Sequence, residues 1–129
     1  MEEQIVSFET AEKLGKIGFI NGSRYYYDVD TQQLIYNDGA IYINGLHDFF
    51  IEAPTQSLAQ KWLREVHNIV ITCASMYENE KNENIIYWFW IQGSPNEDEN
   101  DELSFKTYEE ALEAGLQDGL KLIRAKQKL

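Results

Sequence analysis

The stretch Ile85-Ile86-Tyr87-Trp88-Phe89-Trp90-Ile91 decides the fold of this chain. Its seven large apolar or aromatic residues are too few to cross a bilayer and too β-branched and aromatic to favour a helix, so they predict a β-strand. Because successive strand side chains point to opposite faces, one face receives Ile85, Tyr87, Phe89 and Ile91, and the other receives Ile86, Trp88 and Trp90. Both faces are apolar and need cover. Either helices lie on both sides of the sheet, or one side is left for another copy of the chain or a different macromolecule.

Length and cysteine content predict a single α+β domain, residues 1–129, in a reducing compartment. A chain of 129 residues has the usual size of one domain and can bury a core without cross-links. The lone Cys73 cannot form an intramolecular disulfide, and no N-terminal run has the basic and apolar pattern of a secretory signal. No apolar run approaches the ~20 residues of a membrane-spanning helix. We therefore expect a cytoplasmic protein that does not associate with membranes.

Charge is the strongest departure from an average composition. The chain has 22 acidic and 11 basic residues and a formal net charge of -11 at pH 7. This balance opposes direct nucleic-acid binding, because affinity for the phosphate backbone comes mainly from Lys and Arg. It keeps the chain soluble and favours a basic partner.

Hydrophobic periodicity and turn residues predict elements in the order α-β-β-β-α-β-β-α. The expected helices cover 8–17, a stretch from 55 or 57 to 67, and a stretch from 108 onward. The expected strands cover 24–28, 33–36, 40–43, 69–77 and 85–91, with the last two paired antiparallel. These elements predict an α+β fold in which the second and last helices pack on a mainly antiparallel sheet.

Each predicted helix begins with a hydroxyl side chain that can accept a hydrogen bond from a free backbone N–H group. Ser7 precedes the first helix, and either Thr55 or Ser57 precedes the second. Thr107 and Glu110 have the spacing of a capping box at the start of the last.

The last helix also carries a ridge of small residues at spacing four, formed by Ala111, Gly115 and Gly119. Glycine costs a helix roughly 1 kcal/mol relative to alanine, so two glycines on one face need a packing reason. The ridge predicts a close approach of this helix to a sheet or a neighbouring helix.

The segment 94–102 is predicted to be a mobile acidic surface loop, because residues so charged and polar do not pack. It lacks the glycine and the ligand spacing of an EF-hand calcium loop. In a sharper alternative, the loop imitates the phosphates of DNA together with Glu109, Glu110 and Glu113, and occupies a basic groove on a host nuclease or regulator. Its candidate partner-binding residues are Glu97, Asp98, Glu99, Asp101 and Glu102.

The sequence has no group of residues typical of catalysis or of metal binding. Cys73 alternates with isoleucines on a predicted strand, which indicates a small buried residue rather than a thiol activated by His67. The adjacent His47 and Asp48 resemble the core of the HD phosphohydrolases but lack the further His and Asp ligands of those enzymes. One cysteine and two histidines are too few for a tetrahedral zinc site. We expect no cofactor, no metal and no enzymatic activity.

Trp88 and Trp90 are the second candidate for partner binding. They share a strand face with Ile86, so they lie either beneath a helix or at an interface. Because three helices are available to cover the sheet, we favour the position beneath a helix. Tryptophan is also enriched at interface hot spots, which keeps both residues as candidates for contact with a partner.

Two blocks of the chain, Ala53–Glu65 and Thr107–Leu116, carry a resemblance to a known family. Together with the early hairpin at Tyr25-Tyr26-Tyr27, they are similar to a family of small uncharacterised proteins of phages, prophages and mobile elements of anaerobic gut bacteria. The first block is the more specific of the two, because helix starts like the second recur in many proteins. The resemblance implies an accessory protein that binds a host or phage component, and it offers no catalytic motif.

The sequence therefore predicts a small acidic cytoplasmic accessory protein that binds a macromolecule, most simply another protein or a second copy of itself as a homodimer. Two alternatives stay open: a DNA-mimic inhibitor of a nucleic-acid-binding host protein, and a small enzyme whose site is assembled from distant side chains. A flat aromatic or acidic patch would favour binding, whereas convergent titratable groups in a deep pocket would favour the enzyme.

Overall fold

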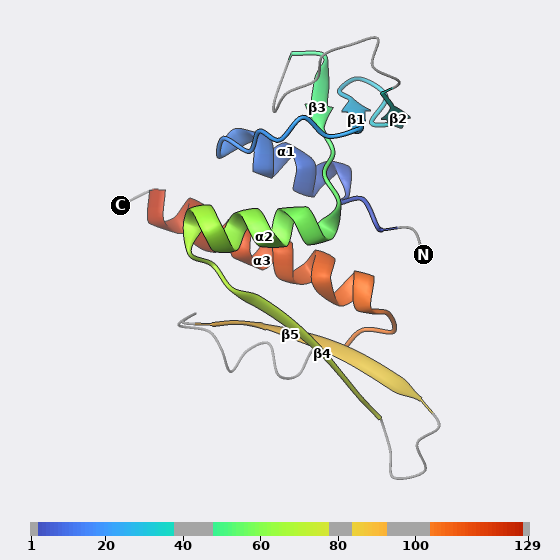
Figure 1. Ribbon diagram of the computed structural model, residues 1–129, viewed down its shortest axis with the longest axis vertical. Helices are drawn as coiled ribbons and strands as arrows, with labels where there is room; N and C mark the ends of the chain where they lie inside the picture. Colours follow the sequence, from blue (N-terminus) through green and yellow to red (C-terminus); the bar gives the residue numbers. More distant parts are fainter. Residues whose placement is uncertain (1–2, 38–47, 78–83, 93–103, 128–129) are drawn as a thin grey trace. The chain divides into compact units, whose positions relative to one another are not determined.

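The computed structural model describes residues 3–37, 48–77, 84–92 and 104–127 (Figure 1). Its elements are α1 (Phe8–Lys16), β1 (Tyr25–Asp28), β2 (Leu34–Tyr36), β3 (Phe50–Glu52), α2 (Gln56–His67), β4 (Ile71–Tyr77), β5 (Ile85–Ile91) and α3 (Tyr108–Gln127). The strand pairs of the described residues are all antiparallel. The predicted α+β class and the order α-β-β-β-α-β-β-α are thus confirmed.

Two compact units make up the chain, and each is described by itself. Unit 1 comprises Met1–Ala59 and unit 2 comprises Gln60–Leu129. Strands β1, β2 and β3 form a three-stranded sheet in unit 1, and β4 and β5 form a two-stranded sheet in unit 2. The described strands thus form two sheets where the sequence analysis expected one. That all 129 residues fold as a single domain stays a prediction.

Helix α1 begins and ends as the sequence predicts. The Ser7 hydroxyl accepts a hydrogen bond from the Thr10 amide at 3.2 Å, which confirms Ser7 as the N-cap. At the other end, Gly18 has a φ of 94°, a left-handed conformation that favours glycine. This turn lets the amide of Phe19 donate to the carbonyl of Leu14 at 3.0 Å and closes the helix.

The sheet of unit 1 has the order β2-β1-β3, with β1 in the centre. The predicted hairpin between 24–28 and 33–36 is confirmed as β1 and β2. Its turn is held by Asp28, whose Oδ1 accepts from the amides of Asp30 and Thr31, each at 2.9 Å. The predicted strand at 40–43 lies outside the described residues. The third strand of this sheet is β3, which the sequence analysis left unassigned.

The core of unit 1 lies where α1 packs against β3. Leu14 of α1 and Ile51 of β3 are buried, as are Val6, Phe19 and Tyr26. The Tyr27 hydroxyl donates to the carbonyl of Val6 at 2.6 Å. This bond ties the central strand to the segment that precedes α1.

Helix α2 starts at the first of its two candidate caps. The amide of Leu58 donates to the Thr55 hydroxyl at 3.2 Å, so Thr55 is the N-cap. The Ser57 hydroxyl instead donates to a carboxylate oxygen of Glu3 at 2.6 Å. The helix ends at His67, where Asn68 takes a left-handed φ of 59°.

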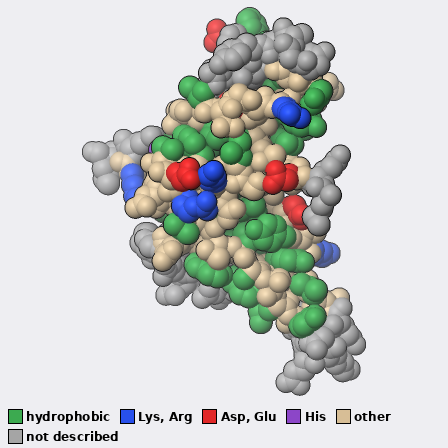
Figure 2. All heavy atoms as spheres, viewed as in Figure 1, with side chains coloured by type: hydrophobic (Ala, Val, Ile, Leu, Met, Phe, Trp, Pro, Cys, Tyr) green, Lys and Arg blue, Asp and Glu red, His purple; other side chains and the backbone are tan. Residues whose placement is uncertain are grey.

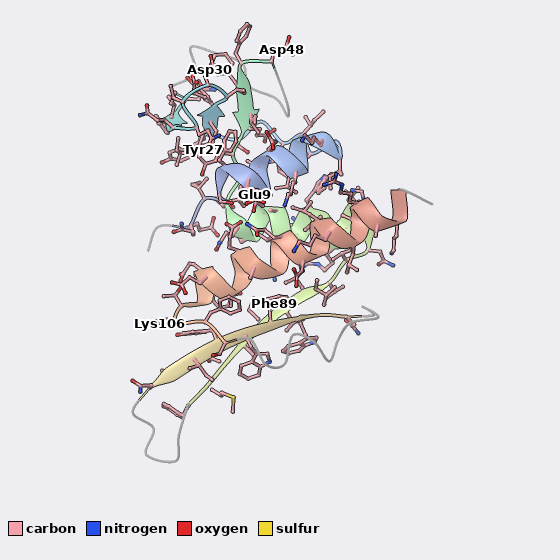
Figure 3. All side chains as sticks on the ribbon, turned by 180° about the vertical axis from the view of Figure 1, so that it is seen from behind. Glu9, Tyr27, Asp30, Asp48, Phe89 and Lys106 are labelled. Carbon is pink, nitrogen blue, oxygen red and sulfur yellow. The ribbon has the colours of Figure 1, made fainter. Side chains whose placement is uncertain are left out.

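In unit 2, β4 and β5 form the predicted antiparallel hairpin, and α3 packs on one of its faces (Figure 1). A methyl group added at Gly115 would lie 2.7 Å from Cγ2 of Ile71 and 3.2 Å from the Phe89 ring. Seen from behind, Phe89 lies on the side of β5 that faces α3 (Figure 3). The close approach predicted from the small-residue ridge is therefore confirmed, and its partner is the sheet.

Helix α3 has 20 residues and the N-cap that the sequence predicts. The amide of Glu110 donates to the Thr107 hydroxyl at 3.1 Å. Glu109 and Glu110 lie in the first turn and Arg124 and Lys126 in the last, an arrangement that complements the helix dipole at both ends. Within the described ranges, no helix is long and apolar enough to span a membrane.

Candidate functional site

The hairpin of unit 2 has one face beneath α3 and a second face that points away from it. Residues paired across an antiparallel ladder share a face. The register pairs Thr72 with Trp90, Ala74 with Trp88, and Met76 with Ile86. We call this set of six residues the aromatic face. The pairs Ile71 with Ile91 and Cys73 with Phe89 belong to the opposite face, which α3 covers.

Burial differs between the two faces. Ile71, Phe89 and Ile91 on the α3 side are each at most 3% exposed. On the aromatic face, Trp88 and Trp90 are half-buried and Met76 is 53% exposed. Helix α3 therefore does not cover the tryptophans, although the sequence analysis favoured a position beneath a helix. Gly115 of α3 fits against Ile71 and Phe89, so this helix packs on their face of the hairpin.

The hydrophobic side chains of unit 2 follow the hairpin in the space-filling view (Figure 2). Several Lys, Arg, Asp and Glu side chains seen in the same view lie over the helices instead. This separation matches the sequence, in which both β4 and β5 are free of charged residues. The aromatic face is therefore an uncharged strip along the hairpin.

The outer edge of β4 is the second feature of this site. Tyr87 exchanges two backbone hydrogen bonds with Phe105, at 2.9 and 2.8 Å, so the N–H and C=O groups of Tyr87 point away from β4. Because these directions alternate along a ladder, the backbone groups of Ile71, Cys73, Ser75 and Tyr77 point away from β5. The Ile71 carbonyl accepts from the Gln60 side chain at 2.7 Å. In the part of the chain that the structure describes, no residue pairs with this edge at Cys73, Ser75 or Tyr77.

The structure describes only the aromatic half of the predicted site. Glu97, Asp98, Glu99, Asp101 and Glu102 lie outside the described residues, as does the predicted loop at 94–102. Of the seven predicted site residues, the structure describes Trp88 and Trp90, which it brings to one face. Glu109 and Glu110 are exposed in the first turn of α3, where their charge already has a structural reason in the helix dipole.

Burial shifts the pKa of both Cys73 and His67, the candidate nucleophile and base of the sequence analysis. Burial raises the pKa of the Cys73 thiol to about 11, so the thiol stays protonated at neutral pH. Burial lowers the pKa of His67, whose ring packs against Trp62 with centroids 4.8 Å apart. His47 lies outside the described residues. Over those that are described, no three His, Cys, Asp or Glu side chains are grouped so that they could hold a metal ion.

A buried carboxylate in unit 1 is a polar feature that the sequence analysis missed. Glu52 is 2% exposed, and its two oxygens accept hydrogen bonds from the amides of Asn21 and Ser23 and from the Ser23 hydroxyl, at 2.6 to 3.1 Å. No local pattern marks Glu52, because its donors lie about 30 residues earlier in the chain. These bonds make it an anchor for the turn at 21–23.

A pocket of about 270 Å³ lies beside this turn in unit 1. Its walls come from Ile5, from the segment 21–25, and from Ala53, Thr55 and Leu58. Arg24 is the one charged side chain among the lining residues, so the pocket does not gather an acid and a base.

Comparisons of the chain with protein families, with curated proteins and with solved structures found no match.

Proposed function

We propose that this protein acts by binding another protein through the aromatic face of unit 2. The observation that carries the proposal is the position of Trp88 and Trp90 on the hairpin face opposite α3. Aromatic side chains that are only half-buried on an uncharged surface are typical of contact sites between proteins. The resemblance noted from the sequence adds that such a protein would be a cytoplasmic accessory protein of a phage or mobile element.

Charge indicates the chemistry of the partner. The aromatic face is uncharged, whereas the whole chain has a net charge of -11. A protein with an apolar patch surrounded by basic residues would match both features, because complementary charge at the rim speeds association and selects the partner. The same negative charge argues against nucleic acid as the direct partner.

Two exposed apolar residues of the hairpin allow a matched test of this role. Met76 and Ile85 are 53% and 49% exposed, but Met76 lies on the aromatic face and Ile85 on the opposite face. Proteins retained from a bacterial lysate by the wild-type chain would be identified, purified and titrated calorimetrically against wild type, Met76→Glu and Ile85→Glu. We expect Met76→Glu to weaken binding at least tenfold and Ile85→Glu to change it little. Equal affinity for all three chains, or no retained protein, would overturn the proposal.

A further inference from the structure

We propose that β4 pairs antiparallel with β4 of a second copy of this chain, so that two hairpins form one four-stranded sheet. This pairing would join two aromatic faces into a single binding surface. In that respect it rests on the proposed function. The pairing itself depends on the backbone groups and side chains of the β4 edge.

The β4 edge is open to another strand. The backbone N–H and C=O groups of Cys73, Ser75 and Tyr77 point away from β5, and no described residue accepts from or donates to them. Ser75 and Tyr77 are exposed, so these groups are within reach of a partner chain. A row of free donors and acceptors at this spacing is recognised by one kind of structure, an extended polypeptide.

The edge also lacks the devices that keep sheet edges apart. Natural edge strands are protected by charged side chains, by proline or by bulges. The strand Ile-Thr-Cys-Ala-Ser-Met-Tyr of β4 contains no charged residue, no proline and no glycine, and its register with β5 runs without a bulge. An open and unprotected strand of seven residues is therefore a surface that a partner strand covers.

A second copy of the chain fits this edge, because its β4 has the same row of unpaired groups and one antiparallel contact satisfies both rows. Two chains that each carry a net charge of -11 repel each other, so their contact is best placed where neither chain presents an acidic side chain. The uncharged β4 strand is such a place, because like charges directly opposite each other in a ladder are destabilising. A strand of a basic protein would find no acidic side chain on β4 to pair with. A second β4 supplies a strand of equal length and equal neutrality.

Symmetry and area agree with this arrangement. An antiparallel pair of identical strands has a two-fold axis, the commonest symmetry of protein dimers. An axis perpendicular to the sheet keeps both aromatic faces on one side and both α3 helices on the other. One hairpin of two seven-residue strands presents a strip of roughly 23 by 10 Å. A second hairpin doubles that area, which brings the surface closer to the roughly 800 Å² per partner of a standard interface without reaching it.

The test uses a proline at the edge. The Ser75 amide points away from β5, so Ser75→Pro removes a donor to the second copy and none to β5. Ser75→Ala keeps the amide and serves as the matched control. We expect light scattering after size-exclusion chromatography to give about twice the 15.1 kDa of one chain for wild type and Ser75→Ala. Ser75→Pro should give a single chain while its circular dichroism matches that of the control.

A second measurement needs no variant. Hydrogen exchange followed by NMR reports each amide of the wild-type chain, and the amides of Cys73, Ser75 and Tyr77 have no acceptor within the described residues. We expect these three amides to be protected at high protein concentration and to exchange rapidly on dilution. Fast exchange at every concentration, or a wild-type chain that stays monomeric, would overturn the pairing.

The two proposals fail in different ways. If Met76→Glu abolishes binding of an identified partner while the wild-type chain is monomeric, the proposed function stands and the β4 pairing is overturned. If the chain is dimeric with protected β4 amides and no protein binds the aromatic face, the pairing stands and the proposed function is overturned.

Discussion

Glu52 illustrates, at the scale of a single residue, how a buried charge is tolerated. Its carboxylate is 2% exposed, yet each oxygen accepts hydrogen bonds from the turn at 21–23. Backbone N–H groups that point at a carboxylate replace the water that it loses on folding. The turn and the end of β3 are therefore held together by one side chain.

Replacing Glu52 by alanine should destabilise the protein. The amides of Asn21 and Ser23 would lose their acceptor, which costs roughly 2–4 kcal/mol of the free energy of unfolding. Glu9→Ala is the matched control, because Glu9 is an exposed carboxylate whose ion pair with Lys13 contributes little. Urea denaturation of both variants checks the prediction. Equal midpoints for Glu52→Ala and Glu9→Ala would contradict it.

Cys73 should react slowly in the folded protein. Burial raises its pKa from 9.0 to about 11, which lowers the thiolate fraction at pH 8 by about 100-fold. Alkylation by iodoacetamide should therefore be about 100-fold slower in buffer than in concentrated urea, and the rate should keep rising past pH 10. A folded-state rate that levels off near pH 9 would show that the thiol is not perturbed.

The same shift fixes the sign of a pH effect on stability. The folded state holds the Cys73 proton more tightly than the unfolded state, so this group stabilises the fold below pH 9.0 and loses that contribution as the pH rises to about 11. Thermal unfolding of wild type and Cys73→Ser across this range measures it. The difference in unfolding temperature between wild type and Cys73→Ser should change only between pH 9.0 and about 11.

At the scale of elements, the packing of α3 on the hairpin depends on the absence of one methyl group. A Cβ at Gly115 would lie 2.7 Å from Cγ2 of Ile71, whereas at Gly119 the nearest side-chain atoms are 3.3 Å away. Gly115→Ala should cost roughly 1–2 kcal/mol, because overpacking outweighs the gain in helix propensity. Gly119→Ala should cost less. Chemical denaturation compares the two.

A rescue variant separates this clash from other effects. Leucine at position 71 lacks the Cγ2 methyl that meets the added Cβ. Ile71→Leu combined with Gly115→Ala should therefore be more stable than the sum of the two single changes predicts. If the destabilisation of the double variant equals the sum of the two single changes, the contact with Cγ2 of Ile71 does not decide the cost of Gly115→Ala.

The elements themselves could largely be predicted from the sequence, because their signals are local. Ser7, Thr107 and Gly18 mark helix ends through hydrogen bonds that span only a few residues. Strand β3 could not be found in this way. It has three residues, one of them the charged Glu52, and it exists because it pairs with β1, about 25 residues earlier in the chain.

The candidate site was predictable in part for a related reason. Strand alternation places Trp88 and Trp90 on one face, and the register confirms it. Which face α3 would cover could not be deduced, since both faces of β5 are apolar. That choice depends on the fit of Gly115 against Ile71 and Phe89, a contact between distant parts of the chain.

At the scale of the whole molecule, net charge should control the association of two copies. Each chain carries -11, so long-range repulsion opposes the proposed β4 pairing. Raising the ionic strength from about 0.01 M to about 0.1 M shortens the Debye length from about 30 to about 10 Å. The dissociation constant of the dimer, measured by analytical ultracentrifugation, should fall over this range. A constant that rises with salt would indicate an interface held by ion pairs instead.

Strand β5 differs from β4 in having its outer side partly occupied. Phe105 takes both outward backbone groups of Tyr87. If two copies pair through β4 as proposed, the outer side of β5 is the edge left at each end of the four-stranded sheet, and the bridge at Phe105 hinders a further strand from adding there. Loss of this bridge would then favour the continued addition of copies over a finite pair.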